Sequence, residues 1–192
     1  TNPKVLLLSC LYFFFTMGLY GISFWLPSLV KASGVTDNFD VGLLSAVPYL
    51  AATIGMILFS RSSDATGERR WHLFAAGGLA AIGLYGSVVY AHNTTFALIA
   101  LTIGTVGVMA SISQFWVLPP AILSGGAAAA GIALVNSVGS VSGVVSPYLI
   151  GWAQTATAST GAGVLALVAC LVFGSLLVFA VPAKLVNVRR SA

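Results

Sequence analysis

Long apolar runs separated by short polar segments dominate the pattern along the chain. Six runs reach the roughly 20 residues that a helix needs to cross the ~30 Å hydrocarbon core of a bilayer. They cover approximately residues 5–30, 41–60, 71–91, 95–118, 127–153 and 161–181. Apolar positions in these runs are continuous, whereas strands of a membrane barrel would alternate apolar and polar residues. The pattern therefore predicts an all-α, polytopic membrane protein in which residues 1–192 form one bundle of six transmembrane helices.

The composition excludes a soluble enzyme and a nucleic-acid binder. Hydrophobic residues make up 58% of the 192 residues and charged residues only 6%, with a mean hydropathy of +1.01. A soluble domain carries about 25% charged residues, so this chain has too few charges to solvate a globular surface. The two cysteines, Cys10 and Cys170, both lie in apolar runs. We therefore expect no disulfide framework, no metal site and no cofactor.

The basic residues predict the orientation of the chain in the membrane. With six spans, both termini lie on one side, together with the second and fourth loops. Seven of the eight Lys and Arg residues fall on that side: Lys4, Arg61, Arg69, Arg70, Lys184, Arg189 and Arg190. The positive-inside rule then places both termini and the second and fourth loops in the cytoplasm. The net charge of +4 follows from this topology, with anionic lipid as a secondary attraction.

The predicted spans contain no charged residue. A proton-coupled transporter needs a titratable group in its pathway, so this chain alone offers no obvious proton carrier. His72 and His92 lie at predicted helix ends, where we interpret them as interfacial residues. An intramembrane hydrolase and a water channel are disfavoured because their characteristic residues are missing from the spans.

Uncharged polar residues recur at helical spacing on three spans. On the first span they form a stripe roughly 80° wide that consists of Ser9, Tyr12, Thr16, Tyr20 and Ser23. Such a stripe lines a cavity or a helix contact, and its two tyrosines favour a cavity. On the fifth span a similar face consists of Asn136, Gly139, Ser140, Gly143 and Pro147. Here the glycines predict close helix packing, whereas the Asn136 amide is a candidate ligand contact.

The fourth span presents two polar faces between which helical spacing cannot choose. One face holds Gly104, Gly107, Ser111 and Gln114, and the other holds Ser113 and Trp116. Pro119 and Pro120 follow directly and predict a break in the helix.

The polar segment 60–70 reads Ser-Arg-Ser-Ser-Asp-Ala-Thr-Gly-Glu-Arg-Arg. It resembles the loop between the second and third helices of each half of the major facilitator superfamily, whose pattern is Gly-x-x-x-Asp-x-x-Gly-x-Lys/Arg-Lys/Arg. The matching residues are Asp64, Gly67, Arg69 and Arg70. Ser60 replaces the leading glycine and Glu68 replaces a usual arginine, as in a degenerate second-half copy. We expect Gly67 to permit a tight turn and Asp64 to bond an exposed helix N-terminus; the alternative is a merely solvated charged turn.

Further segments are similar to the anion:cation symporter branch of that superfamily, which includes bacterial permeases for tartrate, phthalate, sugar acids and hydroxyphenylacetate. These segments are residues 20–27, 42–49, 63–72, 115–119, 128–139 and 146–152. The resemblance implies helices seven to twelve of a twelve-helix protein, with the N-terminal six-helix half absent. It also implies a small organic acid as substrate, moved inward with protons by alternating access between the two halves.

The resemblance also implies roles for single residues. Tyr12, Ser113, Trp116 and Asn136 match substrate-contact positions, which selects the Ser113 and Trp116 face of the fourth span. Tyr20 and Tyr49 fit the wall of the cavity. Asp64 would brace a helix of the first half in the outward-facing state. The proton-binding acid and an anion-pairing arginine would lie in that half.

Two other functions remain open at this point. The same fold could carry a neutral solute or act as an exporter, because few charges face inward. Alternatively, the chain could be a free-standing six-helix channel or a membrane scaffold that dimerises.

Overall fold

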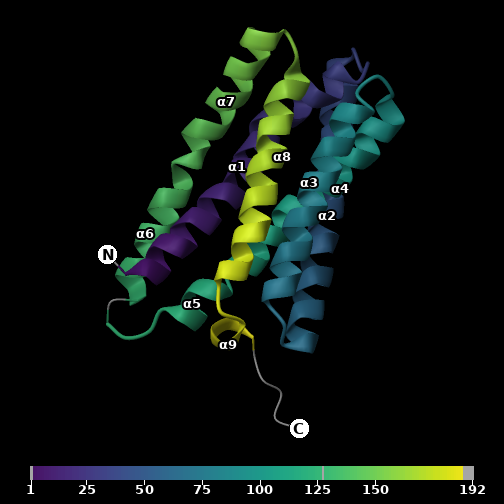
Figure 1. Ribbon diagram of the computed structural model, residues 1–192. Helices are drawn as coiled ribbons and strands as arrows, with labels where there is room; N and C mark the ends of the chain where they lie inside the picture. Colours follow the sequence, from purple (N-terminus) through teal and green to yellow (C-terminus); the bar gives the residue numbers. More distant parts are fainter. Residues whose placement is uncertain (1, 127, 188–192) are drawn as a thin grey trace.

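A computed structural model describes residues 2–126 and 128–187, which are helical and contain no strand (Figure 1). The long helices are α1 (Pro3–Ala32), α2 (Asn38–Thr66), α3 (Arg70–Val89), α4 (Thr94–Phe115), α6 (Ala128–Ser140), α7 (Ser142–Thr157) and α8 (Thr160–Leu177). Short helices are α5 (Leu118–Ile122), η1 (Val178–Ala180) and α9 (Ala183–Val186). Within the described residues, six helical segments are long and apolar enough to cross a membrane, when α4 is counted with α5, α6 with α7, and α8 with η1. The predicted all-α, polytopic architecture is confirmed.

Short polar side chains start three of these helices. Asn2 accepts a hydrogen bond from the Lys4 amide at 3.0 Å, and Asp37 accepts one from the Phe39 amide at 2.8 Å. Asn93 caps α4 in the same way through the Phe96 amide, at 3.2 Å. Each cap satisfies an amide that the first helical turn leaves unpaired. These turns therefore arise from local sequence.

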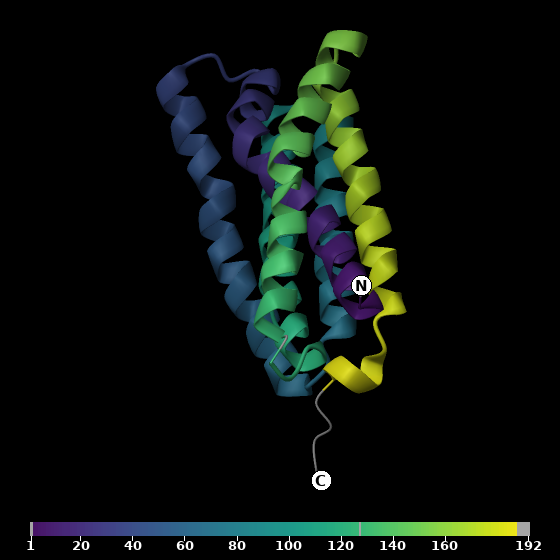
Figure 2. The same cartoon turned by 90° about the vertical axis from the view of Figure 1, so that its left-hand side faces the viewer.

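The helices form a single bundle around α1, which crosses it obliquely (Figures 1 and 2). It packs against α4, α6, α7 and α8, while α3 lies between α4 and α8. In the most apolar 18-residue stretch of α1, 56% of the residues are buried. The corresponding share is 22% in α2 and 17% in the α6–α7 span. The bundle therefore has a well-covered centre and two flanks, α2 and α6–α7, that little of this chain covers.

Glycines bring α3 and α4 into backbone contact. A Cβ atom on Gly83 would lie 2.1 Å from the Gly104 amide nitrogen, and one on Gly107 would lie 2.2 Å from the Ala80 amide nitrogen. Only glycine permits this separation, as in other close-packed membrane helices. The Gly104 and Gly107 face of α4 is therefore a packing surface, and a substrate contact through Ser113 and Trp116 stays a prediction.

Three predicted spans differ from the structure at an end or in the middle. The run 127–153 is broken at Val141 into α6 and α7, where a continuous helix was expected. Helix α4 ends at Phe115, and Pro119 and Pro120 lie in the short α5 that follows. Helix α2 continues to Thr66, so the first half of the 60–70 segment is helical.

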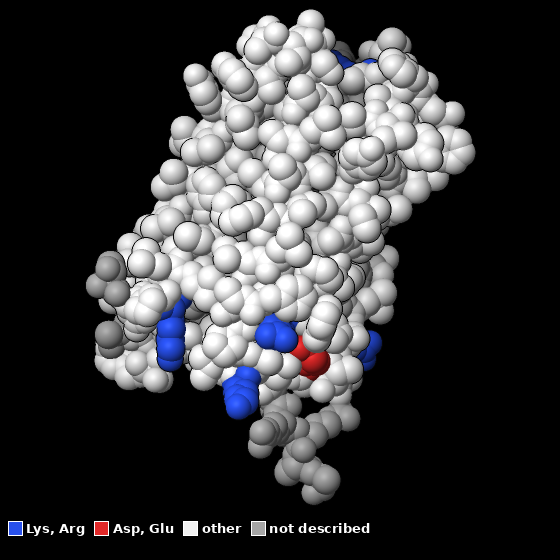
Figure 3. All heavy atoms as spheres, in the orientation of Figure 1, with Lys and Arg blue, Asp and Glu red and all other residues white. Residues whose placement is uncertain are grey.

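Charged side chains gather at the two ends of the bundle. In Figure 3 the lower end carries blue and red atoms, and the middle of the visible face carries none. The start of α1 and the short helix α9 lie at this same lower end (Figure 1). Arg189 and Arg190 fall outside the described residues. That the lower end faces the cytoplasm stays a prediction of the positive-inside rule.

The backbone contact between α3 and α4 predicts a stability difference between two glycines. Gly107→Ala should lower the stability of the full-length protein by about 1–3 kcal/mol, because the new methyl group meets backbone atoms that cannot move aside. Gly78→Ala, on α3 where a Cβ atom would have no neighbour within 4 Å, should be neutral or stabilising. Thermal unfolding of both variants in detergent checks this; equal melting temperatures would contradict it.

Candidate functional site

Tyr12 is the centre of an aromatic cluster that we define as Tyr12, Phe115 and Trp116. The Tyr12 ring stacks on Phe115 with centroids 4.8 Å apart and planes at 19°, and it meets Trp116 edge-on at 4.9 Å. Tyr12 is 8% exposed, Phe115 is fully buried and Trp116 is half-buried. The end of α4 thus holds the Tyr12 ring against α1, and two predicted contact residues, Tyr12 and Trp116, lie side by side.

Two glycines of the fifth span receive the tyrosines of α1. A Cβ atom on Gly139 would lie only 2.0 Å from Cδ1 of Tyr12, and one on Gly143 would lie 3.3 Å from Cζ of Tyr20. A side chain at Gly139 would displace the Tyr12 ring, whereas one at Gly143 would only press against the Tyr20 ring. The two glycines therefore pack against tyrosine rings, and Pro147 lies half-buried one turn further along α7.

The polar stripe of α1 is largely a helix contact. Ser9 and Thr16 are 2% and 1% exposed, Tyr20 is half-buried and Ser23 is exposed. The Thr16 hydroxyl lies 3.1 Å from the Gly139 carbonyl oxygen of α6. Of the two interpretations of the stripe, helix packing thus applies around Thr16, whereas Tyr20 and Ser23 face a less covered surface.

The other predicted contact residues are more dispersed. Asn136 is exposed on α6, one turn before Gly139. Tyr49 lies half-buried on α2 against the hydrophobic core. Ser113 is half-buried, and its hydroxyl donates to the Ala110 carbonyl within α4 at 2.8 Å. The structure therefore assembles Tyr12 and Trp116 directly, with Asn136 on the adjoining helix.

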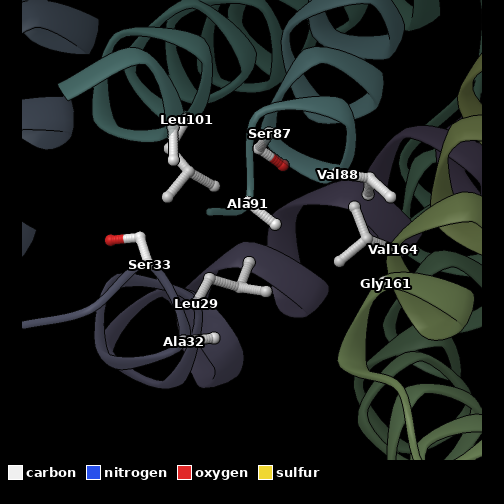
Figure 4. Close-up of a pocket in the computed structure, with 10 residues that line it drawn as sticks. Leu29, Ala32, Ser33, Ser87, Val88, Ala91, Leu101, Gly161 and Val164 are labelled. Atoms are coloured by element: carbon white, nitrogen blue, oxygen red, sulfur yellow. The ribbon is translucent and has the colours of Figure 1, made fainter. Parts of the chain in front are cut away.

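A small cavity lies at the opposite end of the bundle, between the ends of α1 and α3 and the beginnings of α4 and α8 (Figure 4). Its volume is about 50 Å³, whereas small-molecule pockets measure roughly 300–1,000 Å³. Its two hydroxyls, on Ser33 and Ser87, donate to carbonyls of their own helices at 2.8 and 2.7 Å. This cavity is too small, and its polar groups too engaged, to hold an organic acid.

The 60–70 segment ends in a tight turn, as expected. Gly67 ends α2 in the left-handed conformation with φ 70°, and its amide donates to the Ser63 carbonyl. Asp64 was expected to bond an exposed helix N-terminus, but its carboxylate pairs with the Arg69 guanidinium inside this turn. The acid at the N-terminus of α3 is instead Glu68, which accepts a hydrogen bond from the Trp71 amide at 2.7 Å.

Glu68 also joins this turn to the segment after α8. Its second oxygen accepts a hydrogen bond from Asn187 Nδ2 at 2.7 Å, and Asn187 Oδ1 accepts one from the Arg69 amide at 2.9 Å. The Arg70 guanidinium lies 5.3 Å from the centre of the Phe179 ring, at cation–π distance. The glutamate that departs from the motif therefore has a structural role here.

Sequence reasoning did not single out Phe115, Glu68 or Asn187 as functional or structural partners. Phe115 could have been noticed because it directly precedes Trp116 in a short aromatic pair. The contact between Glu68 and Asn187 joins residues 119 positions apart, and no local pattern indicates it.

Comparison with known proteins shows clear relatives, although no family model matches the chain. The putative metabolite transport protein NicT of Pseudomonas putida is 36% identical over 97% of the chain and 43% of its own length. A putative tartrate transporter of Agrobacterium vitis is 40% identical over 91% of the chain and 38% of its own length. A quinolone resistance transporter of Acinetobacter baumannii is 36% identical over 96% of the chain and 42% of its own length. The chain thus spans about 40% of the length of the relatives it matches.

The double role of Glu68 predicts its effect on stability. Glu68→Ala should lower the free energy of unfolding of the full-length protein by about 1–2 kcal/mol, because the Trp71 amide loses its acceptor and Asn187 its partner. Glu68→Gln keeps an oxygen acceptor and should recover part of this loss. Denaturant titration in detergent measures both; an alanine variant as stable as the wild type would contradict the capping role.

Proposed function

The chain belongs to the major facilitator superfamily of solute transporters, and from this premise we propose that it is the C-terminal half of a bacterial inner-membrane symporter for small organic acids. It is not an enzyme, because its relatives are transporters. The observation that carries the proposal is the coverage: nearly the whole chain aligns, but with only about 40% of each relative. A second six-helix half, outside residues 1–192, would complete the transporter.

The proposed substrate contacts are neutral. Tyr12 and Trp116 of the aromatic cluster, Tyr20 beside Gly143, and the exposed Asn136 amide would meet the hydroxyl and carboxylate oxygens of the acid. Ser113 and Tyr49 would contribute at the margin of the same cavity.

Charge would come from the other half. Within residues 2–126 and 128–187, the acidic and basic side chains lie in loops or near helix ends. The proton-binding acid and a basic anion partner are therefore proposed for the N-terminal half. Helices α2 and α6–α7 leave most of their surface uncovered by this chain, and the N-terminal half would pack against them. Rocking of the two halves would give alternating access.

Uptake by the full-length protein in proteoliposomes tests this function. With an inward proton gradient, a panel of tartrate, a sugar acid, an aromatic acid and a neutral sugar should show accumulation of at least one acid and not of the sugar. A protonophore should abolish it. Outward movement of a quinolone without acid uptake would favour an exporter, the alternative suggested by the Acinetobacter relative. No transport in either direction would favour a channel or scaffold.

Replacement of the Asn136 amide should affect transport more than folding. Asn136→Ala should raise KM by about threefold to tenfold, the loss of one hydrogen bond to substrate, with expression retained because the side chain is exposed. Asn38→Ala, at the exposed start of α2, is the matched control and should leave KM unchanged. Unchanged kinetics in Asn136→Ala would remove this residue from the site.

Asp64 is proposed to brace a helix of the other half in the outward-facing state. Its side chain is 65% exposed beside Arg69, which leaves the carboxylate accessible to a second partner. Asp64→Asn should therefore shift the resting state inward, whereas Asp40→Asn at the far end of α2 should not. Maleimide labelling of single cysteines in the two vestibules reports the shift; identical labelling in the wild type and Asp64→Asn would contradict the brace.

A further inference from the structure

The break between α6 and α7 is a structured joint. At Val141 the backbone turns to tighter hydrogen bonds, with the Val141 amide donating to Val138 at 3.2 Å and the Val144 amide donating to Val141 at 3.0 Å. Pro147 has no amide hydrogen, so the Gly143 carbonyl lacks the usual donor four residues on. The helical ladder is thus interrupted before Val141 and at the Gly143 carbonyl, whereas the Val145 amide keeps the regular bond to the Val141 carbonyl at 3.2 Å.

Hydroxyl groups support the backbone at this joint. The Ser142 hydroxyl donates to the Gly139 carbonyl oxygen at 2.6 Å. The Thr16 hydroxyl has three carbonyl oxygens within reach: that of Tyr12 at 2.6 Å, that of Phe13 at 3.1 Å and the same Gly139 oxygen at 3.1 Å. Lipid cannot supply hydrogen bonds, so carbonyls freed at a helix break need such partners from the protein. Of these two hydroxyls, only that of Thr16 comes from another helix.

The two sides of the joint are anchored unequally. Helix α7 packs against both α1 and α8, and its Ser146 hydroxyl donates to the Met17 carbonyl at 2.7 Å. Helix α6 packs almost entirely on α1, and only Val135 and Gly139 are buried within it. The Thr16 contact therefore attaches the less secure arm of the joint.

We propose that Thr16 is a positioning residue, whose hydroxyl sets the angle of α6 at the Val141 joint and thereby the separation of Asn136 from Tyr12. This inference rests on the proposed function, in which these two residues contact the substrate. The Thr16 hydroxyl has one hydrogen, which is shared between the Tyr12 carbonyl oxygen at 2.6 Å and the oxygen of Gly139, three residues after Asn136, at 3.1 Å. A single buried hydroxyl thus couples the two walls of the proposed site.

The positioning role is tested by a distance that does not depend on transport. Spin labels at Leu134 on α6 and Val172 on α8 are attached in the full-length protein after Cys10, Cys170 and any other cysteine are replaced by serine. Thr16→Val, which keeps the shape and removes the hydroxyl, should broaden or shift the α6–α8 distance. Thr16→Ser should restore it. Labels at Val144 and Val172 form the matched α7–α8 control and should show no change.

Transport gives a second readout in the same variants. Thr16→Val should raise KM for the transported acid about threefold to tenfold, the usual range for one interhelical hydrogen bond, with a smaller effect on the maximal rate. An unchanged α6–α8 distance in Thr16→Val would overturn the proposal, as would an equal change in the α7–α8 control. If the wild type transports no acid, the proposed function fails, while the distances still decide the role of Thr16.

Discussion

The need to satisfy every backbone polar group without water organises this structure. In a bilayer each unpaired amide or carbonyl is costly, so regular helices form wherever the sequence permits and irregular backbone survives only where other groups serve it. At Val141, the Thr16 and Ser142 hydroxyls both approach one carbonyl oxygen, that of Gly139. The same constraint applies to side chains: Ser146 donates to the backbone of α1, and Ser113 to its own helix. Polar residues in the spans therefore act first as structural partners, and those left at a less covered surface are the ones available to a ligand.

Glycine has two separate uses in the bundle. Between α3 and α4, Gly83 and Gly107 let two backbones approach, which makes a rigid pair. On α6 and α7, Gly139 and Gly143 make room for aromatic rings of α1 instead. The first use fixes the scaffold, and the second fixes side chains of the proposed site. The rigid pair also carries the aromatic cluster, because Phe115 and Trp116 lie at the end of α4.

The uneven burial of the six spans fits a half that works against another. Helices α2 and α6–α7 expose most of their surface, while α1 is well covered. The 60–70 segment shows the same division: Glu68 is engaged within this chain by Trp71 and Asn187, and Asp64 remains largely exposed beside Arg69. Groups that the chain satisfies internally hold the bundle together. Groups that it leaves accessible are those proposed to meet the substrate or the second half.

Hydropathy was sufficient for the six spans, and the glycine of the 60–70 motif for the turn at Gly67, because each depends on neighbours within a few residues. The resemblance of a few motifs selected the Ser113 and Trp116 face of α4 as a substrate contact, which stays a prediction. The break at Val141, the stacking of Tyr12 on Phe115 and the pairing of Glu68 with Asn187 followed from folding alone. These features join segments far apart in the chain, and which partners meet depends on how closely glycines allow the helices to approach. The distance between two packed helices cannot be predicted from the residues near one position in the sequence.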